Sequence, residues 1–199
     1  NGSGTAPSLA NSNNLRDIGL KSIPLNSPHA VTIPCAVDAF CKLSNDWGKL
    51  GLDKILQPAI HYAERGVPIA ERVAYDLAEL TEALNPSGRE FYLPWGRAPK
   101  VGELFAHHGQ VKVLKEIAKH GRDGFYSGEV AEDMVDSLQK LGGVQTMDDF
   151  SSMEAFYTNP ISSNFSKFEL VEHPPNSQGA TAILLCNILK HFPISSMDP

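Results

Sequence analysis

Residues 124–150 read GFYSGEVAEDMVDSLQKLGGVQTMDDF. Apolar residues recur at helical spacing in the middle of this stretch, so the pattern predicts an amphipathic helix over residues 129–141. They are Val130, Met134, Val135 and Leu138. Gly142 and Gly143 then stop the helix. Thr146 and Asp149 match an N-cap and its partner three residues later, with Asp in place of the usual Glu of a capping box. The stretch therefore predicts one helix, a glycine stop and a second short helical turn.

The same periodicity extends toward the N-terminus. It predicts helices near residues 34–43, 52–65, 68–84 and 111–121, with residues 85–102 as a connector and residues 122–128 as a short turn. Pro58 should kink the second of these helices or delay its regular start. Residues 1–29, rich in Gly, Ser, Asn and Pro, predict an extended or loop segment, with disorder as the alternative.

Toward the C-terminus the pattern changes. Residues 156–164 and 168–172 contain β-formers in partial alternation and predict two strands. Residues 177–190 are mostly apolar and predict a helix that we expect to be buried. The fold class is therefore helix-rich α+β, with too few strands to close a sheet alone. We expect residues 1–29 to be an extended segment, residues 30–150 a helical region, and residues 151–199 strands plus a buried helix.

Composition excludes some classes of protein. The chain has 199 residues, enough for about one domain, and 17 Lys and Arg against 23 Asp and Glu leave a net charge of -6. Without a basic surplus, nucleic acid is not expected as a partner. No apolar run is long enough to span a membrane. The chain starts without Met and reads as a segment of a longer polypeptide, so its compartment stays open.

Chemical motifs are few. The 7 histidines are scattered without metal-ligand spacing. Cys35, Cys41 and Cys186 show no CxxC pattern, and no serine lies in a GxSxG motif. Asp148 and Asp149 could bind a cation, although acidic residues at a helix N-terminus favour the capping interpretation. The sequence therefore predicts no metal, no cofactor and no self-contained active site.

Short sequence blocks occur in a distinctive order. They are TAP at 5–7, HAVTIP at 29–34, WGKL at 47–50, QPAI at 57–60, AERG at 63–66, GFYSGE at 124–129, GG at 142–143, PI at 160–161, PPNSQG at 174–179 and NIL at 187–189. Together they resemble the large subunit of the γ-glutamyltransferase (γ-glutamyltranspeptidase) family, and the resemblance covers nearly the whole chain.

This resemblance implies an N-terminal nucleophile hydrolase with a four-layer αββα sandwich. In that family a precursor cuts itself ahead of a threonine, which then heads a small subunit. The threonine hydroxyl attacks an amide carbonyl, with its own α-amine as base. The implied partners are this small subunit and a small-molecule amide substrate. The nucleophile would lie beyond Pro199, so this large-subunit portion holds no catalytic residue and should be inactive alone.

The resemblance also places a substrate pocket. The candidate pocket residues are Gly2, Ser3, Gly4, Thr5, Asn176, Ser177 and Gln178. Ser3 stands where γ-glutamyl enzymes carry an Arg that binds the glutamate α-carboxylate, and serine cannot supply that charged fork. The turn at 174–179 also departs from the transferase pattern. Both departures resemble oxamate amidohydrolases and acylases. Sequence drift, another basic residue for the carboxylate, and a non-catalytic scaffold protein stay open as alternatives.

Overall fold

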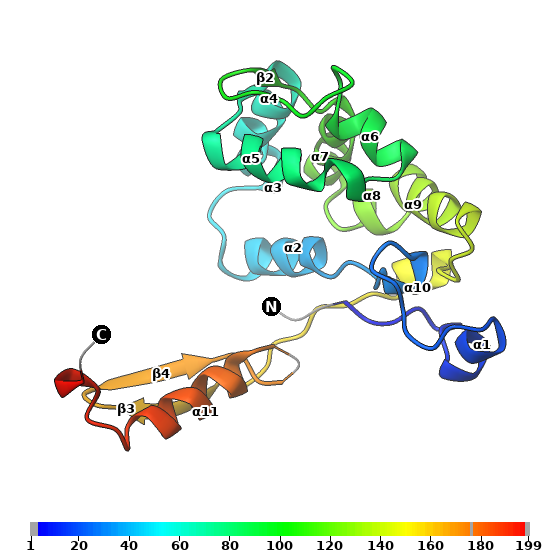
Figure 1. Cartoon of the computed structure of the whole chain (residues 1–199). Coiled ribbons are helices and arrows are strands. Elements are labelled where there is room, and N and C mark those ends of the chain that lie inside the picture. Colours follow the sequence, from blue (N-terminus) through cyan, green and yellow to red (C-terminus); the bar gives the residue numbers. More distant parts are fainter. Residues whose placement is uncertain (1–3, 176, 198–199) are drawn as a thin grey trace.

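The computed structural model describes residues 4–175 and 177–197 and shows two parts (Figure 1). The larger part, which we call the helical body, contains helices α1 to α10. The smaller part, which we call the hairpin unit, contains strands β3 and β4 and helix α11. An extended stretch of chain joins α10 to β3, so the two parts are linked in sequence by a single connection at that point.

Ten α-helices build the described portion of the helical body. They are α1 (Ser12–Asp17), α2 (Ala36–Trp47), α3 (Leu52–Ile55), α4 (Gln57–Arg65), α5 (Glu71–Leu80), α6 (Pro86–Tyr92), α7 (His108–His120), α8 (Asp123–Tyr126), α9 (Glu129–Lys140) and α10 (Met147–Ser151). Short 3-10 helices lie at Pro28–Ala30 and Thr81–Ala83. Strands β1 (Val67–Pro68) and β2 (Leu104–Phe105) pair antiparallel, with Val67 opposite Phe105.

The hairpin unit is a two-stranded antiparallel sheet covered by one helix. Strand β3 (Ile161–Phe165) pairs with β4 (Phe168–Glu172), with Ile161 opposite Glu172 and Phe165 opposite Phe168. The turn between them places Ser166 at a positive φ of 55°. Helix α11 (Gly179–Leu189) packs against both strands, and the Ser163 hydroxyl donates to Asn187 Oδ1 at 2.9 Å. A 3-10 turn at Ile194–Ser196 follows.

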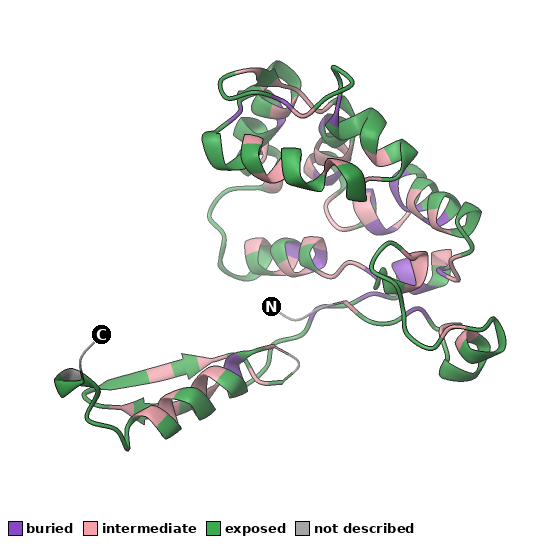
Figure 2. Ribbon diagram, in the orientation of Figure 1, coloured by how far each residue is buried: buried purple, intermediate pink, exposed green. Residues whose placement is uncertain are grey.

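The apolar core lies in the helical body, where Figure 2 shows most of the buried residues. Its central cluster joins α8, α9 and α10 to the segment before α2. The cluster members are Ile33, Tyr126, Ala131, Val135, Phe150 and Met153. Tyr126, Phe150 and Ile33 are each less than 2% exposed. Residues 124–150 therefore supply four of the six members of this central cluster.

Several local predictions are confirmed. Helix α9 covers the predicted stretch, and α10 begins with a complete capping box between Thr146 and Asp149. The predicted helix over residues 52–65 is divided at Leu56, and Pro58 lies in the first turn of α4. The missing amide of proline is harmless in a first turn, which is why Pro58 delays the regular helix rather than breaking it.

Other local expectations need correction. Residues 1–29 are not extended throughout, because α1 forms where the Asn11 side chain accepts a hydrogen bond from the Asn14 amide. The connector at 85–102 contains α6, which Asn85 caps in the same way, with Pro86 in its first turn. The turn at 122–128 contains α8, one helical turn. In the first two cases a side-chain cap stabilises a short helix that has no sustained apolar period.

Helix α11 is not buried within this chain, contrary to the expectation for residues 177–190. Leu184 is 60% exposed, Leu185 54% and Ile188 50%, and Gly179 is the buried residue of the helix. The helix is apolar on all sides, but the two strands cover only one of them. Within the described residues, no helix combines the length and apolar character needed to cross a lipid bilayer.

Candidate functional site

The N-terminal segment lies directly against the chain that precedes α2. The Ile33 amide donates to the Thr5 carbonyl oxygen at 2.9 Å. A Cβ atom on Gly4 would stand only 1.5 Å from the Ile33 carbonyl oxygen. Since no side chain fits in that space, glycine at position 4 permits the close approach of the two backbones. Two predicted pocket residues, Gly4 and Thr5, are thereby held on the core.

The same segment is hydrogen-bonded to Asp149 in α10 and to Met153, two residues after the end of that helix. The Thr5 hydroxyl donates to Met153 Sδ at 3.5 Å, and the Ser8 amide donates to Asp149 Oδ1 at 2.8 Å. Asp149 Oδ2 accepts from the Thr146 amide at 2.9 Å and from its hydroxyl at 2.8 Å. Burial alone would raise the pKa of Asp149, but these hydrogen bonds outweigh it and lower the pKa. The capping box therefore also anchors the N-terminal segment.

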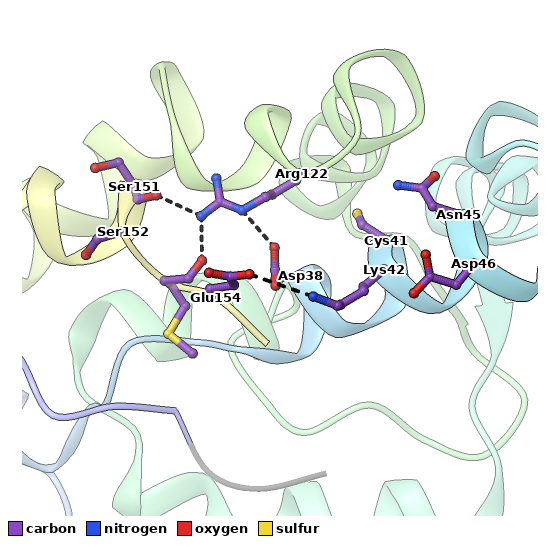
Figure 3. A pocket seen from close by; sticks show the side chains of 10 residues that line it. Asp38, Cys41, Lys42, Asn45, Asp46, Arg122, Ser151, Ser152 and Glu154 are labelled. Atoms are coloured by element: carbon purple, nitrogen blue, oxygen red, sulfur yellow. Dashed lines mark hydrogen bonds and ion pairs between the residues drawn. The ribbon is translucent and has the colours of Figure 1, made fainter. Parts of the chain in front are cut away.

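An open cleft of about 470 Å³ lies between α2, Arg122 and the residues after α10 (Figure 3). Arg122 Nε donates to Asp38 Oδ1 at 2.7 Å, and its Nη2 donates to the carbonyl oxygens of Ser151, at 2.8 Å, and Met153. Asp38 Oδ2 accepts from the Ala155 amide at 2.6 Å. The Asp38–Arg122 ion pair thus makes three hydrogen bonds with the backbone of residues 151–155.

Tyr126 supports this ion pair from within the core. Its hydroxyl accepts from the Asp38 amide at 3.1 Å, and its ring lies 4.9 Å from the Arg122 guanidinium carbon. The N-cap residue of α2, Cys35, makes no side-chain cap, so Tyr126 satisfies an amide that the first turn leaves free. Burial raises the pKa of the Tyr126 hydroxyl to about 12, which keeps it neutral.

The cysteines near the cleft are poor nucleophiles. Burial, and secondly the charge of Asp38, raises the pKa of both the Cys35 and the Cys41 thiols. Because the thiolate is the reactive form, both stay in the unreactive state at neutral pH. Within residues 4–175 and 177–197 there is also no group of three or more His, Cys, Asp or Glu that could hold a metal ion.

The second group of predicted pocket residues lies on the hairpin unit. The Ser177 hydroxyl donates toward the carbonyl oxygens of His173 and Pro174, at 3.4 and 3.3 Å, and Gln178 is the N-cap residue of α11. Gly179 is buried, and a Cβ there would lie 2.4 Å from the His173 carbonyl oxygen. This loop is therefore closely folded onto the end of β4.

The predicted pocket residues thus fall on two units. Gly4 and Thr5 lie against the helical body, whereas Ser177 and Gln178 lie between β4 and α11. Gly2, Ser3 and Asn176 lie outside the described residues. Sequence reasoning missed the Asp38–Arg122 pair, because 84 positions separate its members and no local pattern connects them.

Comparison with known proteins gives a consistent result. The family model described as gamma-glutamyltranspeptidase matches residues 1–199. The glutathione hydrolase-like YwrD proenzyme of Bacillus subtilis (strain 168) is 32% identical over an alignment 203 residues long, which covers 100% of this chain and 38% of the relative. The glutathione hydrolase proenzyme of Escherichia coli (strain K12) is 30% identical over an alignment 172 residues long, which covers 84% of this chain and 30% of the relative.

Solved structures share the fold. Cephalosporin acylase from Bacillus halodurans superimposes with a TM-score of 0.88 at 31% identity, over 96% of this chain and 38% of the acylase chain. Helicobacter pylori gamma-glutamyltranspeptidase gives 0.88 at 24% identity, over 98% of this chain and 58% of the other. The chain spans 38% and 30% of the lengths of the two curated relatives. It is a helix-rich α+β portion of the N-terminal nucleophile hydrolase fold, and it belongs to the gamma-glutamyltranspeptidase family.

Proposed function

We propose that the complete protein is a self-processing amide-bond hydrolase or acyltransferase, and that this chain is part of its large subunit. The family match over residues 1–199 carries the proposal. The names of both curated relatives call them proenzymes, which supports a precursor that is cut. The partner of this chain would be its own small subunit, headed by the catalytic threonine.

The proposed reaction follows the chemistry of an N-terminal threonine. Its hydroxyl attacks the amide carbonyl, its free α-amine accepts the hydroxyl proton, and backbone donors stabilise the oxyanion. The C–N bond then breaks as the α-ammonium returns this proton to the leaving amine, and water or an acceptor amine takes the acyl group from the threonine oxygen. Residues 30–150 would support the central sheets, and residues 151–199 would add strands and a helix to the sandwich. Gly2, Ser3, Gly4, Thr5 and the 176–178 turn would face the substrate.

For the substrate, we favour an amide that lacks the free glutamate α-carboxylate. Ser3 stands at the position of the family's carboxylate-binding Arg and carries no charge with which to replace it. The 31% identity with a cephalosporin acylase supports this branch. The second candidate is γ-glutamyl hydrolysis or transfer, which the names of the glutathione hydrolase relatives favour.

The first experiment is intact mass with N-terminal sequencing of the protein expressed from its whole gene. Two chains, the smaller beginning with Thr, are expected. A single uncut chain would contradict self-processing and favour a non-catalytic relative that serves as a scaffold.

The second experiment separates the substrates. The processed protein is assayed with a γ-glutamyl anilide, oxamate and a set of acyl-amides, beside a Ser3→Arg variant. We expect acyl-amide or oxamate hydrolysis in the parent, and a gain of γ-glutamyl activity in the variant. Strong γ-glutamyl transfer by the parent would overturn the argument from Ser3.

A further inference from the structure

The charged residues of the cleft pair with protein groups around them, which indicates a structural role for them. Lys42 pairs with Glu154 at 3.7 Å, and Asp46 accepts from the Tyr157 hydroxyl at 2.8 Å. Arg122 is engaged by Asp38 and two carbonyl oxygens, as Figure 3 shows. The principal charges of the cleft thus have partners within the protein. Apart from the Asp38–Arg122 contact itself, these contacts join α2, or Arg122 at the N-cap of α8, to residues 151–157.

Residues 151–155, whose backbone Arg122 and Asp38 bind, begin the connection between the two parts of the molecule. It starts at the end of α10 and continues as the extended stretch that leads to β3 (Figure 1). Residues 151–155 form the body end of this connection, and its other end is the hairpin unit, which carries Ser177 and Gln178. The three backbone contacts from Arg122 and Asp38 act at the start of that connection.

Met153 links the Asp38–Arg122 pair to the N-terminal segment. Its carbonyl oxygen accepts from Arg122, and its sulfur accepts from the Thr5 hydroxyl. The residue is 5% exposed and belongs to the core cluster. Met153 thus contacts Thr5 directly, and it lies at the start of the chain segment that leads to Ser177.

The pair is also suited to hold a fixed geometry. The Asp38 side chain is 8% exposed and the Arg122 side chain 29%. The planar guanidinium presents donors in a rigid fork, which lysine cannot reproduce. By contrast, Arg97 and Glu103, with side chains 43% and 29% exposed, form an ion pair within one loop, only 6 positions apart, and connect no separate elements.

We propose that Arg122 and Asp38 are a positioning pair that sets the placement of the hairpin unit relative to the helical body, and so of Ser177–Gln178 relative to Gly4–Thr5. The catalytic part of this inference rests on the proposed amide-hydrolase function. The pair touches no substrate and acts through the backbone of residues 151–155.

The activity test uses the full-length processed enzyme with its best amide substrate and counts active sites by titration. Arg122→Gln should lower kcat/KM by about 100-fold per active site, since a misplacement of about 1 Å has effects of that size. Arg122→Lys and Asp38→Asn should lose less, and Arg97→Gln should match the parent. Unchanged kcat/KM per active site in all three pair variants would overturn the proposal, even if their melting temperatures fall.

A geometric test keeps the inference independent of the reaction. Fluorescent amino acids at the exposed Lys119 and Lys167 report the distance between the helical body and the hairpin turn by energy transfer. The pair variants that fold should shift or broaden this distance, whereas Arg97→Gln should not. If the parent proves inactive, the proposed function fails while this measurement still decides on the pair, and an unchanged distance in Arg122→Lys and Asp38→Asn contradicts it.

Discussion

The helical body and the hairpin unit both contain apolar sequence, yet the buried hydrophobic residues of the described chain all lie before the hairpin unit. Phe150 in α10 is 1% exposed, whereas Leu184 in α11 is 60% exposed. The body contains helices that cover one another, and the hairpin unit offers α11 only one two-stranded sheet. The difference shows that an apolar helix needs cover on several sides, and that the cover for α11 is not supplied by the described part of this chain.

The polar contacts of the two regions differ in the same way. In the body, Gln145 donates from Nε2 to the carbonyl oxygens of Pro28 and Val31, and Asp149 holds the Ser8 amide. In the hairpin unit, Ser163 and Asn187 lie 24 positions apart. Long-range bonds therefore stabilise the body as a whole, and the hairpin unit is held by more local contacts.

The largest expected effect comes from removing a core side chain of the body. Phe150→Ala should reduce the free energy of unfolding by about 3–5 kcal/mol, because it leaves a cavity in a packed core. Phe168→Ala in β4 is the matched control, with a side chain 65% exposed. It should change stability by less than about 0.5 kcal/mol. Urea denaturation followed by circular dichroism checks both, and equal losses would contradict the contrast between the regions.

The next effect concerns the close approach of the N-terminal segment. Gly4→Ala should destabilise by about 1–3 kcal/mol, because the new methyl group meets the Ile33 backbone. Gly109→Ala in α7 is the control, since its Cβ would lie 3.6 Å from the His107 ring, an ordinary contact. That change should be neutral or stabilise by about 0.5 kcal/mol. Thermal denaturation measures the pair, and a neutral Gly4→Ala would show that the segment is not held as described.

A smaller effect concerns the stability of the helical body at low pH. The lowered pKa of Asp149 means that its charge stabilises the fold above the ordinary carboxylate range near about pH 4, and that this contribution is lost as pH falls through the lowered pKa. Asp149→Asn should cost about 1 kcal/mol at neutral pH and flatten the loss of stability in acid. The exposed Asp148→Asn should do neither. Denaturation midpoints at a series of pH values measure these changes. The prediction is wrong if Asp149→Asn loses stability in acid as steeply as the parent does.

The smallest effect on the stability of this chain by itself should come from the outer side of α11. Leu184→Ser should change the stability of this chain by less than about 0.5 kcal/mol, because the side chain is already exposed. In the complete processed protein the same change should cost about 2 kcal/mol if other elements cover the helix. Ile117→Ser, at a position 7% exposed, is a control that should destabilise both forms. Equal, small effects of Leu184→Ser in both would mean that α11 stays uncovered.

Sequence alone predicted the local structure of this protein where an apolar period, a capping box or a proline marks it. Helix α9, the capping box of Thr146 and Asp149, and the effect of Pro58 all follow from apolar spacing, side-chain caps and the missing proline amide. The family resemblance was equally available, because the blocks that carry it are contiguous. Helices α1 and α6 were missed because an asparagine cap, rather than an apolar period, stabilises each.

Tertiary structure alone decided the contacts between distant segments. Tyr126 caps α2 from 88 positions away, Arg122 pairs with Asp38 across 84, and Ser8 reaches Asp149 across 141. The exposure of α11 was decided in the same way, since burial depends on which elements surround a helix and not on its own composition. Local cues act through covalent neighbours and are written in order along the chain, whereas packing and long-range hydrogen bonds depend on the path of the whole backbone.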